Sequence, residues 1–347
     1  MQIFDKGFFY EKLIAKSNLH DLNNVRDVYY RKFNIVINNK KRSIATVLEG
    51  TTLYKLQFRL KNNYLDKLPL PDCVIGYRKG KSYRDFLVPH VKLDKNDRFF
   101  VRLDIKSFFD SINEDVIKEA LQDYVKIAGE EDRNRVISDI IDICTLEGKL
   151  PQGALTSPAL SNICFKRLDL RIRSYCRKLG YTYTRYVDDL LFSSTDLSLI
   201  KPKFIQMIKL ILSDYGMKLN HRKIIQTKNL ISLNGFVISD EIRISKSKMN
   251  HLLSLLFCIE QNLKSRNLAE LLEKLNQIRQ RDGKRDFLTV DDVMEFLSGS
   301  RAYLIAWNSS DSSAWKVKCT KFILRIERQL VSLDKKHGQE LRGVNFY

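Results

Sequence analysis

The stretch Tyr186-Val187-Asp188-Asp189 places two adjacent carboxylates between two segments that resemble short β-strands. Residues 181–186 are rich in aromatic and β-branched side chains, and residues 190–194 form a second short run with apolar character. This pattern predicts a β-hairpin with the acidic pair at its tip. On its own, an Asp-Asp pair is also typical of a solvated turn, because aspartate favours turns for local hydrogen-bonding reasons. Whether the pair does chemistry depends on which other side chains the fold brings to it.

A further carboxylate, Asp104, lies near the end of an alternating segment at residues 98–105. The apolar residues of this predicted strand share one side, so Asp104 points to the opposite side. An aspartate near a strand end can also cap the next segment. Beside Asp188 and Asp189, however, it would complete a group of three carboxylates whose mutual repulsion raises their pKa values. Two Mg²⁺ ions would remove this conflict and would support phosphoryl transfer by activating the attacking hydroxyl and stabilising the leaving pyrophosphate.

The composition indicates a globular chain with a polyanionic partner. The 347 residues exceed what one hydrophobic core usually serves, so two or three subdomains are expected. The net charge of +19 favours contacts with phosphates, although ribosome-bound and membrane-surface proteins share such a charge. No run of 18 apolar residues occurs and the N-terminal stretch carries early charges, so we expect a cytoplasmic protein without a membrane segment. The six cysteines have neither metal-site nor disulfide spacing and are expected in the core.

Apolar spacing predicts an α+β chain. Short helices are expected within residues 5–32, followed by a β-hairpin over residues 35–47 that turns at Asn38-Asn39. Further helices are expected over residues 53–64, 113–128, 131–147, in a long segment ending near Gly180, and over 199–215, with more strands around Gly235 and Asp240. From residue 245 onward the chain has no proline and its apolar spacing predicts a helical bundle.

Together, these motifs resemble those of reverse transcriptases. The stretch Asp104-Ile105-x-x-Phe108-Phe109 resembles the first palm motif, Leu150-Pro151-Gln152-Gly153 with Ser157-Pro158 the second, and the Asp188-Asp189 hairpin the third. Gly216-Met217-x-Leu219-Asn220-x-x-Lys223 resembles the fourth motif, Leu233-Asn234-Gly235-Phe236 the primer grip, and Gly76-Tyr77-x-x-Gly80-x-Ser82 the fingers motif of bacterial members. The resemblance runs from about residue 40 to residue 245.

This resemblance implies an RNA-directed DNA polymerase with a right-hand fold of fingers, palm and thumb, in which the palm sheet is antiparallel and the thumb helical. The implied parts are an N-terminal and fingers region at 1–97, a first palm part at 98–112, an insertion at 113–157, a second palm part at 158–244 and the thumb at 245–347.

The resemblance also implies roles for individual residues. Asp104 and Asp188 would bind both metal ions with help from the Ile105 carbonyl, and Asp189 would be a supporting acid that completes the metal set. Mn²⁺ is an expected substitute for Mg²⁺. Phe109 would pack against the sugar of the incoming nucleotide and exclude a 2′-OH, which makes DNA the product. A plain core aromatic is the alternative reading of Phe109.

Other nucleotide contacts are expected from the loops. Gln152 and Gly153 would shape the pocket, and a glycine there allows close backbone approach. Lys41, Arg42, Arg78 and Arg84 are candidate triphosphate contacts, with Arg42 and Arg78 foremost. In a chain this basic, a solvated surface charge is the more common role for any one of them. Lys223 would protonate or neutralise pyrophosphate, while Asn234, Gly235 and Phe236 would grip the primer.

Among bacterial members, the chain most resembles retron enzymes, in the stretches LPQGALTSPALSN and YTRYVDDLLFSS. These enzymes prime from a 2′-OH of a structured noncoding RNA and copy part of it into covalently linked single-stranded DNA (msDNA). The implied partners are that RNA, dNTPs, the RNA–DNA hybrid and an effector protein, and the implied role is antiphage defence.

The chain also departs from the retron pattern, with Phe86-Leu87-x-x-His90 for Asn-Ala-x-x-His, Leu233-Asn234-Gly235 for Val-Thr-Gly, and Val187 for alanine. A second hypothesis is therefore a defence-associated or abortive-infection-type enzyme that makes DNA from another noncoding RNA or without an external template. A third is an inactive RNA-binding scaffold.

Overall fold

The computed structural model describes residues 2–15, 19, 26–37, 40–91, 96–263, 267–307 and 313–343. The chain divides into two compact units, residues 1–90 with 95–229 and residues 91–94 with 230–347, and each is described by itself. This division falls inside the range 158–244 that the sequence suggested for one palm segment, and the expected domain limits stay a prediction.

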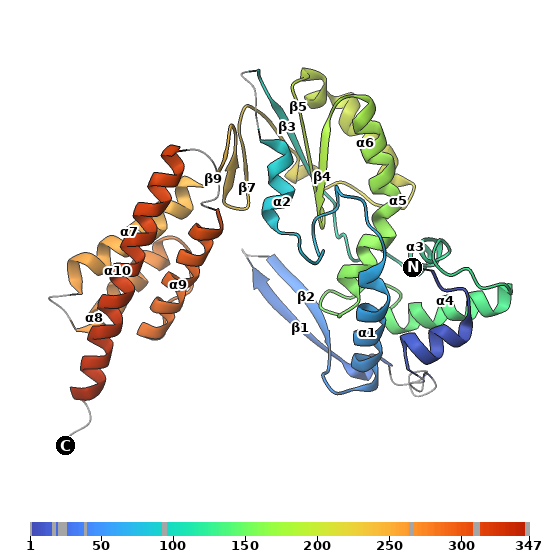
Figure 1. The fold of residues 1–347 in the computed structure, drawn as a ribbon, viewed down its shortest axis with the longest axis horizontal. Coiled ribbons are helices and arrows are strands. Elements are labelled where there is room, and N and C mark those ends of the chain that lie inside the picture. Colours follow the sequence, from blue (N-terminus) through green and yellow to red (C-terminus); the bar gives the residue numbers. More distant parts are fainter. Residues whose placement is uncertain are drawn as a thin grey trace. The chain divides into compact units, whose positions relative to one another are not determined.

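A four-stranded antiparallel sheet in the order β4-β5-β3-β6 forms the centre of the first unit (Figure 1). Its strands are β3 Phe99–Asp104, β4 Thr182–Tyr186, β5 Asp189–Ser194 and β6 Ile225–Lys228. Because β4 ends at Tyr186 and β5 begins at Asp189, the two are joined only by Val187 and Asp188. The hairpin predicted around the acidic pair is confirmed.

The two faces of this sheet differ in chemistry. Val101 lies opposite Phe192 on the apolar face, where the Phe192 ring meets that of Phe204 in α6 (Pro202–Ser213) at a centroid distance of 5.0 Å. Asp104 lies opposite Asp189, one residue out of phase with that apolar set. Since successive strand residues point to opposite faces, both aspartates belong to the other face. The alternation of β3 thus places Asp104 on the side away from this part of the core, as predicted.

The first unit also contains several helices. They are α1 Thr52–Asn63, α2 Tyr83–Leu87, α3 Glu114–Leu121, α4 Glu130–Cys144, α5 Ser157–Lys178 and α6 Pro202–Ser213. Of these, α2 and α5 contact β4. Shorter helical turns are η1 Phe8–Leu13, η3 Arg26–Tyr29, η4 Leu65–Lys67, η5 Val88–His90, η6 Leu197–Ile200 and η7 His221–Lys223. The long helix α5 has Pro158 in its first turn and stops shortly before Gly180, whose φ of +69° suits a helix end.

A separate hairpin is formed by β1 Tyr30–Ile37 and β2 Lys40–Val47, which pair antiparallel. The predicted hairpin is confirmed, while its turn at Asn38-Asn39 and the expected helical positions Leu22 and Val25 lie outside the described residues. The expectation of helix as far as Lys32 is wrong, because β1 begins at Tyr30. Tyr30 pairs with Val47, and this cross-strand pairing overrides the local spacing.

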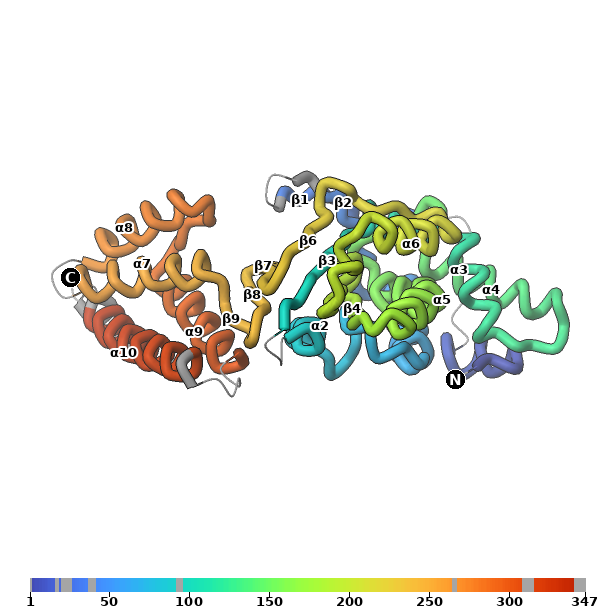
Figure 2. Tube along the Cα trace, turned by 90° about the horizontal axis from the view of Figure 1, so that it is seen from above, coloured from blue at the N-terminus to red at the C-terminus, as the bar shows by residue number. Residues whose placement is uncertain are grey.

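The second unit combines a small sheet with helices. Its strands are β7 Ile231–Leu233, β8 Phe236–Ile238 and β9 Ile242–Ile244, and its helices are α7 Lys246–Asn262, α8 Leu268–Arg281, α9 Val290–Trp307 and α10 Ser313–Gly343. Figure 2 shows these four helices gathered into a bundle, which confirms the helical prediction for this region. All six cysteines are buried and free. Among the described residues, none of the helices has the length and apolar content that crossing a membrane requires.

Candidate active site

The turn of the β4–β5 hairpin has a strained backbone. Val187 adopts φ +61°, a left-handed conformation that a β-branched residue rarely takes. Conformations of this kind cost about 1–3 kcal/mol and persist only where surrounding contacts fix them. The next residue is Asp188, so whatever holds Val187 also fixes the start of the acidic pair.

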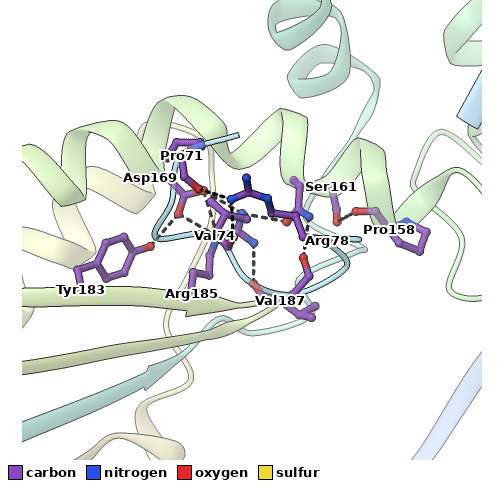
Figure 3. Close-up of polar contacts among 11 residues, drawn as sticks. Pro71, Val74, Arg78, Pro158, Ser161, Asp169, Tyr183, Arg185 and Val187 are labelled. Atoms are coloured by element: carbon purple, nitrogen blue, oxygen red, sulfur yellow. Dashed lines mark hydrogen bonds and ion pairs between the residues drawn. The ribbon is translucent and has the colours of Figure 1, made fainter. Parts of the chain in front are cut away.

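The contact that holds this turn comes from a buried arginine, shown in Figure 3. Arg185 is fully buried, and its Nη1 donates to the carbonyl oxygen of Val187 at 3.0 Å. Its Nε and Nη2 donate to both carboxylate oxygens of the equally buried Asp169 in α5, at 2.8–3.1 Å. The hydroxyl of Tyr183 donates to the same carboxylate at 2.8 Å, and the guanidinium lies 4.5 Å from the ring centroid of Phe165. A buried charge pair thus ties the β4–β5 hairpin to α5.

The same network includes the segment before Tyr77. The backbone N–H of Ile75 donates to the Arg185 carbonyl at 2.9 Å, and the Asn162 side chain donates to the Gly76 carbonyl at 2.9 Å. A Cβ on Gly76 would lie 2.7 Å from the backbone nitrogen of Val187, so only glycine permits this approach. Arg185 also donates to the Asn162 side-chain oxygen at 3.0 Å. The loop that contains Gly76 and the acidic turn are therefore packed as one piece.

Asp104 and Asp188 meet at the end of β3. The Ile105 backbone N–H donates to the Asp188 carbonyl at 3.0 Å, which joins the strand end to the hairpin turn. Asp104 is 2% exposed; its Oδ1 accepts from Lys223 and its Oδ2 accepts from the Asn220 side chain at 3.3 Å. Burial raises the pKa of Asp188, and the Asp104 charge raises it further. The structure therefore brings together the two aspartates on which the sequence interpretation rested.

Asp189 has a different environment from Asp188. Its Oδ1 accepts hydrogen bonds from Arg102 Nε at 3.0 Å and Nη2 at 2.5 Å, from the neighbouring strand β3. Burial raises the pKa of Asp189 to about 6, and the Arg102 cation opposes that rise. One carboxylate of the pair is thus bound to an arginine, while Asp188 lies half-buried beside Asp104.

The donor set fits a divalent ion that also takes ligands from a substrate. Within the part of the chain that the structure describes, no group of three or more metal-ligating side chains is close enough to hold an ion. Mg²⁺ is often held by one or two carboxylates together with substrate phosphates, so Asp104 and Asp188 match that requirement. Asp104 already carries a cationic partner in Lys223, which shows that positive charge is stabilised there.

Phe109 lies beside Tyr77, and the loop at residues 150–153 packs against β2. The ring of Phe109 is partly buried and lies 6.3 Å from that of Tyr77. Gln152 accepts the backbone hydrogen bond of Ala45 in β2 at 2.8 Å. Gly153 has φ +114°, and a Cβ there would lie 2.9 Å from Ile44, so the loop needs glycine to pack against β2. The structure thereby joins β2, which carries Arg42, to this loop.

The predicted triphosphate contacts occupy unlike positions. Arg42 is exposed on β2, paired with Ile35 across the hairpin. Arg78 donates from Nη1 to the carbonyls of Pro71 and Val74 at 2.9 and 3.1 Å, so its guanidinium binds the loop that leads to Tyr77. The Lys41 side chain lies outside the described residues. The nucleotide roles of Arg42 and Arg78 stay predictions.

The predicted primer grip lies in the second unit, at the β7–β8 turn. Asn234 and Gly235 form this two-residue turn with φ +48° and +84°, as an Asn-Gly hairpin favours. Phe236 is buried, with its ring 3.9 Å from that of Trp307. Lys248 donates to the Asn234 carbonyl at 3.2 Å. The turn geometry is thus well supported, and its contact with a primer stays a prediction.

Several residues that shape the site were missed in the sequence: Arg102, Asn162, Asp169 and Arg185. A signal existed for one pair. Arg185 follows Tyr181 and Tyr183 at period two, on the apolar side of its strand, and Asp169 lies between apolar residues in the middle of a helix. Two charged residues at positions that a pattern assigns to the core indicate a buried ion pair.

Comparison with known proteins agrees with this geometry. The sequence matches the family described as reverse transcriptase (RNA-dependent DNA polymerase) over residues 40–280. It is 28% identical over 247 residues to the retron Ec86 reverse transcriptase of Escherichia coli, covering 66% of this chain and 73% of that protein. It is 33% identical over 161 residues to the retron Mx65 reverse transcriptase of Myxococcus xanthus, covering 43% of this chain and 37% of that protein.

Similarity to solved structures is lower. A telomerase from Candida albicans in complex with a fragment of telomeric RNA has a TM-score of 0.47 and 13% identity, over 88% of this chain and 63% of that one.

The family match covers more than half of the sequence and includes Asp104, Gln152, Gly153, Asp188 and Asp189. The chain therefore belongs to the reverse transcriptase family of RNA-directed DNA polymerases, with an α+β polymerase fold, and resembles its retron-type members.

Proposed function

We propose that this polymerase extends a primer hydroxyl with dNTPs at the carboxylates of Asp104 and Asp188. The observation that carries this proposal is the junction at the end of β3, where the Ile105 N–H donates to the Asp188 carbonyl at 3.0 Å. That bond joins two segments more than 80 residues apart in the sequence and brings their carboxylates to one place. Catalysis of phosphoryl transfer consists mostly of such positioning and charge stabilisation.

Two Mg²⁺ ions are the proposed cofactors, with Mn²⁺ as a substitute. When bound, divalent ions would lower the pKa of the attacking hydroxyl and stabilise the charge on the leaving pyrophosphate. The proposed holders are the Asp104 and Asp188 carboxylates with the Ile105 carbonyl. Asp189, which binds Arg102, is proposed to support the site by fixing β5 against β3.

The remaining residues of the site would bind and orient the nucleotide. Phe109 is proposed to exclude a 2′-OH, and Gln152 with Gly153 would form the pocket wall against β2. Arg42 would contact the triphosphate from the exposed side of β2. Lys223 forms an ion pair with Asp104 and would neutralise the negative charge that develops on pyrophosphate.

We further propose that the template is a structured noncoding RNA that this enzyme copies into single-stranded DNA, as in retrons. The support is the similarity to retron reverse transcriptases and a net charge of +19, which favours a polyanionic partner. An antiphage role, an effector protein and a cytoplasmic location are extensions of the same analogy. A defence-associated enzyme with another template is the alternative.

The test uses protein purified with its own nucleic acid. Wild-type protein is expected to incorporate dNTPs with Mg²⁺, and the Asp188→Ala/Asp189→Ala variant should lose incorporation while still binding RNA. Normal polymerisation by this variant would show that the site is elsewhere. A branched RNA–DNA hybrid among the products supports the retron template, whereas unbranched repetitive or protein-linked DNA supports the alternative.

A further inference from the structure

Tyr77 combines exposure with a costly backbone conformation. Its side chain is 49% exposed, although it is a large aromatic residue. Its φ of +57° lies in the left-handed region, where a residue with a bulky side chain is a genuine outlier. Strained residues of this kind cluster at sites where function requires one particular placement of a side chain. The chemistry proposed for Asp104 and Asp188 does not use this residue.

The neighbours of Tyr77 fix its backbone from both sides. Gly76 is held by the Asn162 side chain and packs against Val187 so closely that a Cβ would lie 2.7 Å from the Val187 nitrogen. On the other side, the Arg78 guanidinium binds two carbonyls earlier in the same loop (Figure 3). The left-handed conformation is therefore imposed by contacts that also fix the acidic turn.

The ring of Tyr77 faces residues of the proposed nucleotide site. Its centroid lies 6.3 Å from that of Phe109, with the ring planes inclined at 52°. Burial and the charge of Asp188 raise the pKa of the Tyr77 hydroxyl, while the Arg42 cation opposes this rise. Tyr77 thus lies near the proposed sugar gate, the proposed metal-binding carboxylate and the proposed triphosphate contact.

We propose that Tyr77 contacts the incoming nucleotide and, together with Phe109, sets dNTP affinity and the discrimination against ribonucleotides. The inference rests on the proposed function, because it requires Asp188 to mark the reaction centre. A tyrosine ring has a flat apolar face for a sugar or base and has few rotatable bonds to immobilise. Its half-exposed state provides the open face that a nucleotide would cover.

A purely structural role makes a different prediction. If Tyr77 only packed behind Phe109, a strained and half-exposed tyrosine would be a poor choice for that position. Glycine adopts positive φ without steric cost, so Tyr77→Gly removes the ring and relieves the backbone at once. This substitution separates the stability of the loop from its contact with substrate.

The experiment compares three variants by primer extension at increasing dNTP concentration and by thermal unfolding. Tyr77→Gly is expected to raise KM for dNTP roughly tenfold, to change kcat little, and to leave Tm unchanged or higher. Its preference for dNTP over rNTP should fall several-fold, whereas Tyr77→Phe keeps the ring and should match wild type. Glu147→Gly is the matched control: Glu147 also has positive φ, at +52°, and its ion pair is with the exposed Lys32.

The inference is overturned if Tyr77→Gly keeps KM and sugar discrimination within twofold of wild type. It is also overturned if Tyr77→Phe loses as much affinity as Tyr77→Gly. Asp188→Asn, measured in parallel, separates a failure of the proposed function from a failure of the proposed Tyr77 contact. If Asp188→Asn is active, the reaction centre does not lie at Asp188. If Asp188→Asn is inactive and Tyr77→Gly behaves like wild type, only the role of Tyr77 is wrong.

Discussion

Substitution of Arg185 by methionine is expected to cause a large loss of stability. The guanidinium is fully buried, and the Asp169 carboxylate beside it is buried to the same degree. Removing the arginine leaves Asp169 with the Tyr183 hydroxyl and no cation. Breaking a buried pair in this way costs about 3–5 kcal/mol, because an uncompensated charge remains in the core. A domain stability of roughly 5–15 kcal/mol means that much of the total is lost.

The double variant Arg185→Met/Asp169→Leu removes both charges and should recover at least half of that loss. Both proteins lack the hydrogen bond to the Val187 carbonyl, so both should show kcat lowered on the order of 10²-fold. Urea unfolding followed by circular dichroism measures the free energy of unfolding, and primer extension at saturating dNTP measures kcat. A double variant as unstable as Arg185→Met would refute the ion-pair reasoning. One with wild-type kcat would show that the Val187 contact does not position the turn.

Three further predictions concern pH, packing and metal. His90 is buried between Ser193 and Thr184, and burial lowers its pKa to about 3, from an ordinary value of 6.5. The imidazole in the unfolded chain is therefore protonated at a higher pH than in the folded protein. The free energy of unfolding should fall by up to about 1.4 kcal/mol per pH unit as pH decreases from 6.5 towards 3. Chemical denaturation of His90→Gln should show a shallower dependence of the unfolding free energy on pH. Gly76→Ala should lose about 1–3 kcal/mol of unfolding free energy and most activity, because its Cβ meets the turn backbone; an unchanged urea midpoint would contradict this close packing. EDTA should stop primer extension without shifting the urea midpoint, because the described residues contain no closed metal cluster; a shifted midpoint would reveal a structural ion.

Patterns with a short period in the sequence were reliable guides to the fold. The alternation of β3 predicted that Asp104 lies on the side opposite Val101, and the apolar runs on both sides of Asp188 predicted the hairpin. Both follow from the two-residue period of a strand, which requires no knowledge of distant partners. The helical prediction after residue 245 succeeded for the same reason, through the 3.6-residue period.

Features that depend on partners far along the chain were not predictable in this way. The start of β1 at Tyr30 depends on its pairing with Val47, and the Arg185–Asp169 ion pair joins a strand to a helix. The Arg78 guanidinium binds carbonyls of its own loop, a contact that the sequence did not indicate. Side-chain partners of this kind follow from tertiary packing, which local spacing does not encode.

The substitution Asp104→Asn tests whether Asp104 and Asp188 form the reaction centre of this polymerase. Asparagine keeps the size of the side chain and removes its charge, so protein fold and RNA binding should be retained while primer extension falls at least about 10³-fold. Asp110→Asn is the matched control, since Asp110 is an exposed aspartate six residues further along the chain. We expect the Asp104→Asn protein to be folded and inactive, and the Asp110→Asn protein to be fully active. Equal extension by both variants would contradict this expectation.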